Sequence, residues 1–316
     1  MPSANLNPVR RVWGMWGTFT RLTRNPVVIK ELRGRMRGAR AIALLTFHLM
    51  VMSAYVGGVN LLYAATANQV YSSFAPQTLG KNIFVGLVFI ELILACFITP
   101  AITASAVSGE RERQTFDMLR TTLLPTPAFV LGKLFSALVF VILMLVAGLP
   151  LQSLSFLLGG VAPFDMVVAS ALLLATAYLF GSAGILFSTL VRRTLGATVL
   201  TYGFALISTL GLPLLLLPWS FFGGYFYAPI PLQALGQYGF YLLALTNPIA
   251  TGFITEATLT SYQSYFYYTT YLYSNYGATI TLPFISPWLP FTLFATVTGT
   301  LMLLVSIGLI QRADQK

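Results

Sequence analysis

Long apolar runs alternate along this chain with short clusters of charged residues. Six runs reach the length of about 20 helical residues that a bilayer core of about 30 Å requires. Each run is continuously apolar, as expected for a helix that satisfies its own backbone hydrogen bonds in lipid. The runs are 41–63, 83–107, 134–158, 165–190, 195–218 and 286–310. The sequence therefore predicts an all-α integral membrane protein, a six-span helical bundle in a single transmembrane domain covering residues 1–316.

The distribution of basic residues predicts which ends of these spans face the cell interior. Lys and Arg lie in four stretches and at one isolated position, Lys81; the stretches are 10–40, 111–133, 192–193 and 312–316. Basic residues are retained on the cytoplasmic side of a membrane. An even number of predicted spans separates each consecutive pair of stretches, so all four fall on one side. We therefore expect both termini to be cytoplasmic and Lys81 to lie outside.

Composition excludes several function classes. With 57% hydrophobic residues, 8% charged residues and a mean hydropathy of +0.79, the chain cannot form a soluble globule. The net charge of +10 is concentrated beside apolar runs, so anionic lipid of the bilayer is the expected partner and nucleic acid is not. One cysteine and one histidine leave no basis for a disulfide framework, a bis-histidine haem or a metal site.

Catalytic residues are also missing from the sequence pattern. Gly80-Lys81 and Gly132-Lys133 lack the preceding Gly and the following Ser or Thr of a phosphate-binding loop. A membrane-embedded enzyme needs clustered His, Asp or Glu at depth, and no such cluster appears. We expect a non-enzymatic chain that holds no cofactor of its own.

The N-terminal segment 1–40 contains a predicted amphipathic helix. Asn25 is suited to an N-cap and Pro26 to the first helical position. Up to about residue 40, apolar positions recur at spacings of three and four beside a basic stripe that includes Lys30, Arg33 and Arg37. Such a helix lies in the membrane interface. Its role is either to set the topology or to dock a cytoplasmic partner, and Glu31 is expected to pair with Arg35.

A second charged element lies in the predicted cytoplasmic loop 108–133, between the second and third spans. Ser108 can cap a helix over about 109–120, with Glu110 and Glu112 near its positive end. Pro125 and Pro127 are expected to end this helix. Its mixed charge favours a protein surface as partner over lipid, which would select basic residues alone. A solvated helix without a partner is the alternative.

The predicted outer loop, 219–285, has a different composition. Its only charged residue is Glu256, and it holds eleven of the sixteen tyrosines. Tyrosine is typical of the membrane interface, so 262–276 is expected along the outer surface. Residues 232–254 are expected as a re-entrant pair broken at Asn247-Pro248. The sequence thus predicts outer re-entrant or interfacial helices, with two further spans as the alternative.

Within the spans, Glu91 is a possible intramembrane polar site. A carboxyl group in lipid is costly and normally faces a bundle interior, a cavity or a partner subunit. It either serves a substrate or a proton, or is protonated and hydrogen-bonded to Ser, Thr or backbone. His48 is expected to serve packing or an interhelical hydrogen bond. Small residues, among them Gly181, Gly184 and Gly299, are expected at close helix contacts.

Two motifs resemble the permease subunits of type 2 ABC transporters, a family of bacterial exporter membrane domains. The first is Asn25-Pro26 followed by Lys30-Glu31-Leu32-Arg33-Gly34-Arg35. The second runs from Ser108-Gly109-Glu110-Arg111-Glu112 through Thr115-Phe116-Asp117-Met118-Leu119 to Pro125 and Leu131-Gly132-Lys133.

The resemblance implies a dimer of permeases in a prokaryotic plasma membrane. Each permease is bound on its cytoplasmic face by an ATPase subunit, which holds the ATP and Mg²⁺. Residues 25–40 are similar to the family's connecting helix, with Lys30, Glu31, Arg33 and Arg37 on it. Residues 109–120 are similar to its coupling helix, and the implied ATPase contacts are Gly109, Glu110, Arg111, Glu112, Thr115, Phe116, Asp117 and Arg120.

Two other functions stay open at this point. One is a non-catalytic membrane anchor in a larger complex, in which the charged helices only dock. The other is a secondary transporter, for which Glu91 would be the sole supporting residue.

Overall fold

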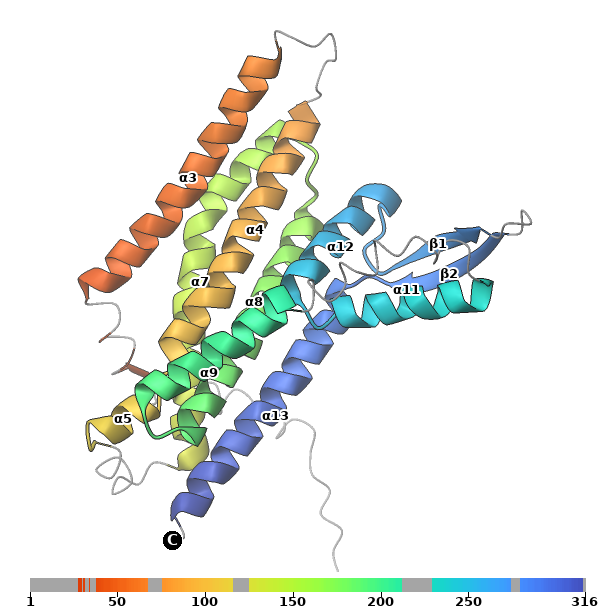
Figure 1. Cartoon of the computed structure of the whole chain (residues 1–316). Helices are drawn as coiled ribbons and strands as arrows, with labels where there is room; N and C mark the ends of the chain where they lie inside the picture. The colour runs from red at the N-terminus through yellow and green to blue at the C-terminus, as the bar shows by residue number, and fades with distance from the viewer. Residues whose placement is uncertain are drawn as a thin grey trace, which may run out of the picture.

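The computed structural model describes residues 28–29, 31, 34, 38–67, 76–115, 125–211, 229–273 and 279–314. Within them, six helices are long and apolar enough to cross a membrane. They are α3 (Ala39–Ala67), α4 (Pro76–Thr103), α7 (Thr126–Leu158), α8 (Pro163–Leu190), α9 (Thr194–Leu206) with its π-helical continuation η1 (Ile207–Gly211), and α13 (Trp288–Asp314). The predicted all-α bundle of six spans is confirmed (Figure 1).

Proline explains where some helix ends differ from the prediction. The third span was expected from residue 134, but α7 begins at Thr126 after Pro125, which is extended, with Pro127 in the first turn. Proline is tolerated there because the first N–H groups of a helix have no internal partner. Pro125 and Pro127 therefore begin α7, and residues 116–124, where they were expected to end a helix, lie outside the described residues. Residues 212–218 of the predicted fifth span lie outside the described residues.

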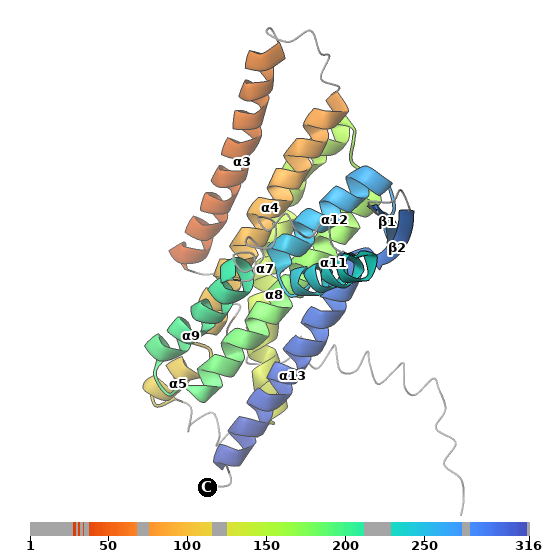
Figure 2. The ribbon, with the colours of Figure 1, turned by 45° about the vertical axis from the view of Figure 1, so that its right-hand side comes forward.

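Helix α8 is the centre of the bundle and packs against α13, α4, α9 and α7, whereas α3 lies at the periphery (Figures 1 and 2). The predicted close contacts at small residues are confirmed. A Cβ atom on Gly181 would lie 2.9 Å from Leu134 Cδ1, and one on Gly299 would lie 2.6 Å from Tyr178 Cε1. Glycine at these positions lets the helix backbones approach, which is how helices associate in lipid.

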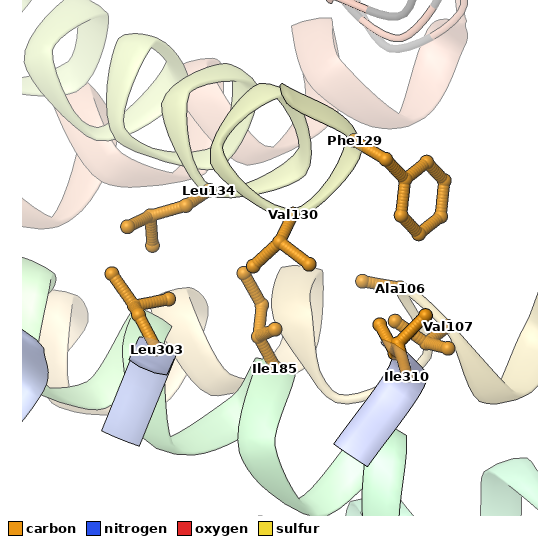
Figure 3. Packing of buried hydrophobic residues seen from close by; sticks show 8 residues of the cluster. All are labelled: Ala106, Val107, Phe129, Val130, Leu134, Ile185, Leu303 and Ile310. Carbon is orange, nitrogen blue, oxygen red and sulfur yellow. The ribbon is translucent and has the colours of Figure 1, made fainter. Parts of the chain in front are cut away.

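The core at one end of the bundle joins α7, α8 and α13. Val130 and Leu134 of α7 face Ile185 of α8 and Leu303 of α13, with Val107 and Ile310 beside them (Figure 3). All six are at most 4% exposed. This layer keeps the starts of α7 and the ends of α8 and α13 together, at the place where the charged segments meet the bundle.

The outer segment contains two short helices, α11 (Ile230–Ala244) and α12 (Pro248–Tyr262). Each has 15 residues, about 22 Å at 1.5 Å per residue, which is too short for a bilayer core of about 30 Å. This length argues against two further spans. The expected break is confirmed, because Asn247 caps α12 by accepting a 2.9 Å hydrogen bond from Ala250 N. The relation of both helices to the bilayer stays a prediction.

A β-hairpin follows where the sequence predicted only re-entrant or interfacial helices. Strands β1 (Tyr267–Tyr273) and β2 (Thr279–Ile285) pair antiparallel, with Tyr268 opposite Phe284. Alternate side chains, including Tyr268, Leu272, Leu282 and Phe284, pack toward α11, while Tyr267 and Tyr271 are exposed. The period of two in a stretch rich in Tyr and Thr indicates a strand. The expectation of helices alone was therefore wrong for this part.

Candidate functional site at the basic end of the bundle

A short helix, α5 (Ser108–Glu112), lies at the end of the bundle where the basic residues gather. It stands beside the junction of α8 and α9 (Figure 1). Of the predicted helix over 109–120, the described residues are helical only as far as Glu112, because Gln114 adopts a left-handed backbone with φ 58°. Phe116, Asp117 and Arg120 lie outside the described residues.

The N-terminus of α5 is anchored to α8 by one serine. Ser188 Oγ accepts hydrogen bonds of 2.9 Å from both Val107 N and Ser108 N. The first N–H groups of a helix have no partner within it, so a buried helix start needs such an acceptor. Ser108 was expected to cap the helix with its own side chain; instead Val107 is the N-cap residue, and Ser108 is buried against Ser188.

The last residues of α5 bind the two helix ends that meet at the α8–α9 turn. Arg111 Nη1 donates a 2.9 Å hydrogen bond to Thr189 O, at the C-terminus of α8. The Glu112 carboxylate accepts from Thr194 N at 2.9 Å and from Thr194 Oγ1 at 2.7 Å, at the N-terminus of α9. A cation at a helix C-terminus and an anion at an N-terminus both complement the helix dipole. The charges of Arg111 and Glu112 thus each match the helix end that they touch.

A buried lysine joins α5 to two further segments. Lys133 Nζ of α7 lies 3.0 Å from Glu110 Oε1 of α5 and also forms a salt bridge with Glu31 Oε1 of the N-terminal segment. The Lys133 side chain is 5% exposed and lies 5.7 Å from the centre of the Phe129 ring. We call Lys133, Glu31 and Glu110 the charge cluster. One ammonium in it is shared by two carboxylates from separate segments.

The predicted N-terminal helix is described only in part. Residues 28–29, 31 and 34 are helical, while Lys30, Arg33, Arg37 and Arg35 lie outside the described residues. The expected Glu31–Arg35 pair therefore stays a prediction, and the structure places Glu31 against Lys133. Thr115, another predicted site residue, donates to Glu110 O at 3.3 Å and also contacts the Glu110 carboxylate. Gly109 faces α9, where an added Cβ would lie 3.7 Å from Thr194 Cγ2.

Sequence reasoning missed Ser188 and Thr194, and it named Lys133 in the second motif without predicting it as a site residue. A signal existed for Lys133, because a lysine that begins an apolar run normally has a partner. Ser188 and Thr194 carry no comparable signal. Their roles depend on α5 folding back onto the α8–α9 turn, some 80 residues further along the chain.

Glu91 is not part of the charge cluster. It is 3% exposed within α4, and its Oε2 accepts a 2.9 Å hydrogen bond from Gln152 Nε2 of α7. The partner is thus an amide side chain, not the Ser, Thr or backbone group that was expected. Its Oε1 faces Gly148 of α7 and has no hydrogen-bond partner among the described residues.

Comparison with known proteins agrees with this architecture. A family model described as ABC-2 family transporter protein matches residues 25–310, nearly the whole chain. That range includes every element of the site, the first five candidate spans and all but the last residues of the sixth. No curated protein sequence matches the chain. The chain belongs to the ABC-2 family of transporter proteins, and so is a permease, a multi-pass membrane component of an ABC transporter.

Proposed function

We propose that this chain is the permease subunit of an ATP-driven exporter, in which α5 receives movement from a separate cytoplasmic ATPase subunit. The observation that carries the proposal is the attachment of one five-residue helix to three spans. Ser188 and Arg111 link α5 to α8, Glu112 links it to α9, and Lys133 links it to α7. A helix with only a topological role needs no such set of charged contacts.

Movement of α5 would be passed on as a rigid-body displacement. Its polar groups are paired with backbone and charged partners: Ser108 is buried, Glu110 and Arg111 are half-buried, and Glu112 is exposed. Networks of this kind are stiffest where water is excluded, which is the side of α5 that faces α7 and α8. A push on α5 therefore shifts the α8–α9 turn and the start of α7 together. Since α8 also packs against α4 and α13, the displacement reaches most of the bundle. Alternating access would follow from tilting of these helices.

The N-terminal segment belongs to the same mechanism. Glu31 shares Lys133 with Glu110, so the segment and α5 contact the same ammonium. We propose that both face the cytoplasm of a prokaryotic cell, in line with the retention of basic residues on that side. The ATPase binds ATP and Mg²⁺, and a second permease subunit completes the transporter. Exposed apolar residues such as Leu195 of α9 and Ile207 of η1 then face lipid or that subunit.

Purification and reconstitution test the proposal. The full chain is purified with its bound proteins, and the ATP turnover of the reconstituted complex is compared with that of its isolated ATPase. Arg111→Ala should lower the turnover of the complex by about tenfold, because a charge-assisted hydrogen bond of about 1.5–3 kcal/mol is lost. Arg312→Ala is the matched control, since it removes an exposed arginine from the same end of the bundle.

Each outcome separates the competing functions. A bound ATPase whose turnover is unchanged by Arg111→Ala points to a membrane anchor. Uptake or export driven by a proton gradient, with no ATPase bound, points to a secondary transporter. Sidedness is tested separately with Arg113→Cys in a Cys96→Ser background, Cys96 being buried. Labelling of sealed cells by an impermeant maleimide contradicts the proposal; labelling only of inverted vesicles supports it.

A further inference from the structure

A narrow pocket lies between α4, α8 and α12, toward the end of the bundle opposite α5. Its walls are mostly apolar, formed by Phe84, Phe89, Leu92, Val168 and Leu172. Three polar residues complete the lining: Asp165 at the start of α8, and Thr255 and Glu256 on α12. Neither the charge cluster nor the α8–α9 turn contributes to it.

Polar and apolar groups are separated along this pocket. At the inner end, a Cβ atom on Gly252 would lie 3.5 Å from Phe89 Cζ and 3.6 Å from Leu92 Cδ2, so α12 approaches the apolar wall there. At the outer end, Glu256 forms a salt bridge of 3.4 Å with Lys81, which lies before Phe84 on α4. The pocket is thus apolar inside and charged at its mouth.

The charge at the mouth is negative on balance. Glu256 and Asp165 are both carboxylates, and Lys81 forms a salt bridge with Glu256 but none with Asp165 among the described residues. Burial raises the pKa of Glu256, the neighbouring Lys81 lowers it, and Asp165 raises it again. Asp165 also accepts a 2.8 Å hydrogen bond from Ala162 N. Two carboxylates beside one ammonium favour a cationic ligand over an anionic one.

Thr255 gives an independent indication of a ligand. It is 4% exposed and lines the pocket, and its Oγ1 has no hydrogen-bond partner within the described part of the chain. Elsewhere on α12, Thr258 and Thr260 donate to backbone carbonyls of their own helix, at 2.7 and 2.8 Å. Thr255 makes no such bond. A buried hydroxyl without a partner is costly, and a polar ligand group in the pocket would satisfy it.

We propose that this pocket binds an amphipathic primary amine with a single slender hydrocarbon chain. The ammonium donates to the Glu256 carboxylate and to Thr255 Oγ1, with Asp165 close by. The chain lies between the apolar walls of α4 and α8, whose narrow spacing selects against bulky ring systems. This chemistry occurs in free alkylamines and in aminophospholipids that insert one acyl chain. The site goes beyond the proposed ATP coupling and does not depend on it.

Equilibrium binding to the purified full chain in detergent tests the site without any ATPase. The probe is radiolabelled decylamine, with decanol and decanoate as competitors of equal chain length. We expect one saturable site for decylamine and at least tenfold weaker competition by decanol and decanoate. Glu256→Gln should weaken binding by about tenfold or more, and Thr255→Val by about threefold, from the loss of a charged and a neutral hydrogen bond respectively.

Two further variants separate binding from folding. Gly252→Ala adds a methyl group at ordinary contact distances and keeps every polar group, so the chain should fold while decylamine binds several-fold more weakly. Thr258→Val is the matched control for Thr255→Val, because Thr258 is buried on α12 but does not line the pocket. It should leave the affinity within about twofold.

Nanodiscs distinguish the two sources of the amine. Loss of decylamine binding in phosphatidylethanolamine nanodiscs, but not in phosphatidylcholine nanodiscs, identifies an aminophospholipid. Equal binding in both identifies a free amine, and either result supports the site. Equal affinities of decanol and decylamine, or unchanged binding in Glu256→Gln, would overturn it.

Discussion

Replacing Lys133 with methionine tests whether the charge cluster holds α5 and the N-terminal segment to the bundle. Methionine keeps an unbranched apolar stem but removes the ammonium shared by Glu31 and Glu110. Their side chains are 19% and 16% exposed, so water solvates the remaining carboxylates only in part. Removing one partner of a buried ion pair costs about 3–5 kcal/mol, and this partial exposure places Lys133→Met near the lower value, about 3 kcal/mol.

Thermal unfolding of the purified chain measures this loss. At about 2 °C per kcal/mol for a chain of this size, Lys133→Met should lower Tm by about 6 °C. Adding Glu31→Gln and Glu110→Gln to Lys133→Met should restore at least half of the loss, because neutral amides need no counter-charge. The control is Lys81→Met, whose 3.4 Å bridge to Glu256 joins side chains that are 27% and 21% exposed.

The control should lower Tm by less than Lys133→Met does, because it leaves one carboxylate without its cation instead of two, and the Lys81 side chain is 27% exposed where that of Lys133 is 5% exposed. Equal stability of Lys133→Met and Lys81→Met would show that the charge cluster does not hold these segments to the bundle. A triple variant less stable than Lys133→Met alone would show the same, because the two carboxylates would then be stabilising without their cation.

Three further predictions concern α5, the bundle core and the outer hairpin. Ser188→Ala removes the acceptor of two backbone N–H groups and should speed amide hydrogen exchange at residues 107–108 by about fivefold or more. Faster exchange along α8 as well would instead indicate a global loss of stability. Gly184→Val places a side chain into Thr103 of α4 and should destabilise the chain by about 3 kcal/mol or more in a thermal unfolding assay. Gly203→Ala is the control, because no atom lies within 4 Å of the added Cβ, and it should leave Tm unchanged or slightly higher. If Gly203→Ala lowered Tm as much as Gly184→Val, close contact with Thr103 would not be the cause. Tyr241→Phe removes a 2.5 Å hydrogen bond to a carbonyl of β2 and should cost about 1 kcal/mol, seen as faster proteolysis of the hairpin; unchanged cleavage shows that apolar packing alone holds it.

The sequence was sufficient for the spans because their cause is local. An apolar run long enough to cross a bilayer must satisfy its backbone internally, and α3, α7, α8 and α13 follow almost directly from that requirement. The break at Asn247-Pro248 was equally predictable, since an N-cap and a proline act within one turn. The hairpin was missed because eleven tyrosines were taken as a membrane-interface signal, and the period of two in 267–273 was not weighed against it.

The candidate site depends mainly on contacts between residues that are distant in the sequence. The residues of α5 were identified from their charge and capping pattern, but their partners were not. Glu31 meets Lys133 across 102 positions, and Ser108 meets Ser188 across 80. Packing of apolar faces and glycine contacts sets the spacing between the helices. That spacing determines which polar groups of distant segments come within hydrogen-bonding distance.

By itself the sequence determined that the chain is a helical membrane protein with its basic residues gathered at one end. The length of each apolar run and the position of each charge can be read from the local sequence, without knowledge of how the helices pack. The tertiary structure alone decided that a five-residue helix joins α7, α8 and α9, and that Thr255 and Glu256 share a pocket with the apolar wall of α4. Burial makes each of these polar groups costly unless it is paired, and only the packing of distant helices determines which partner lies within reach.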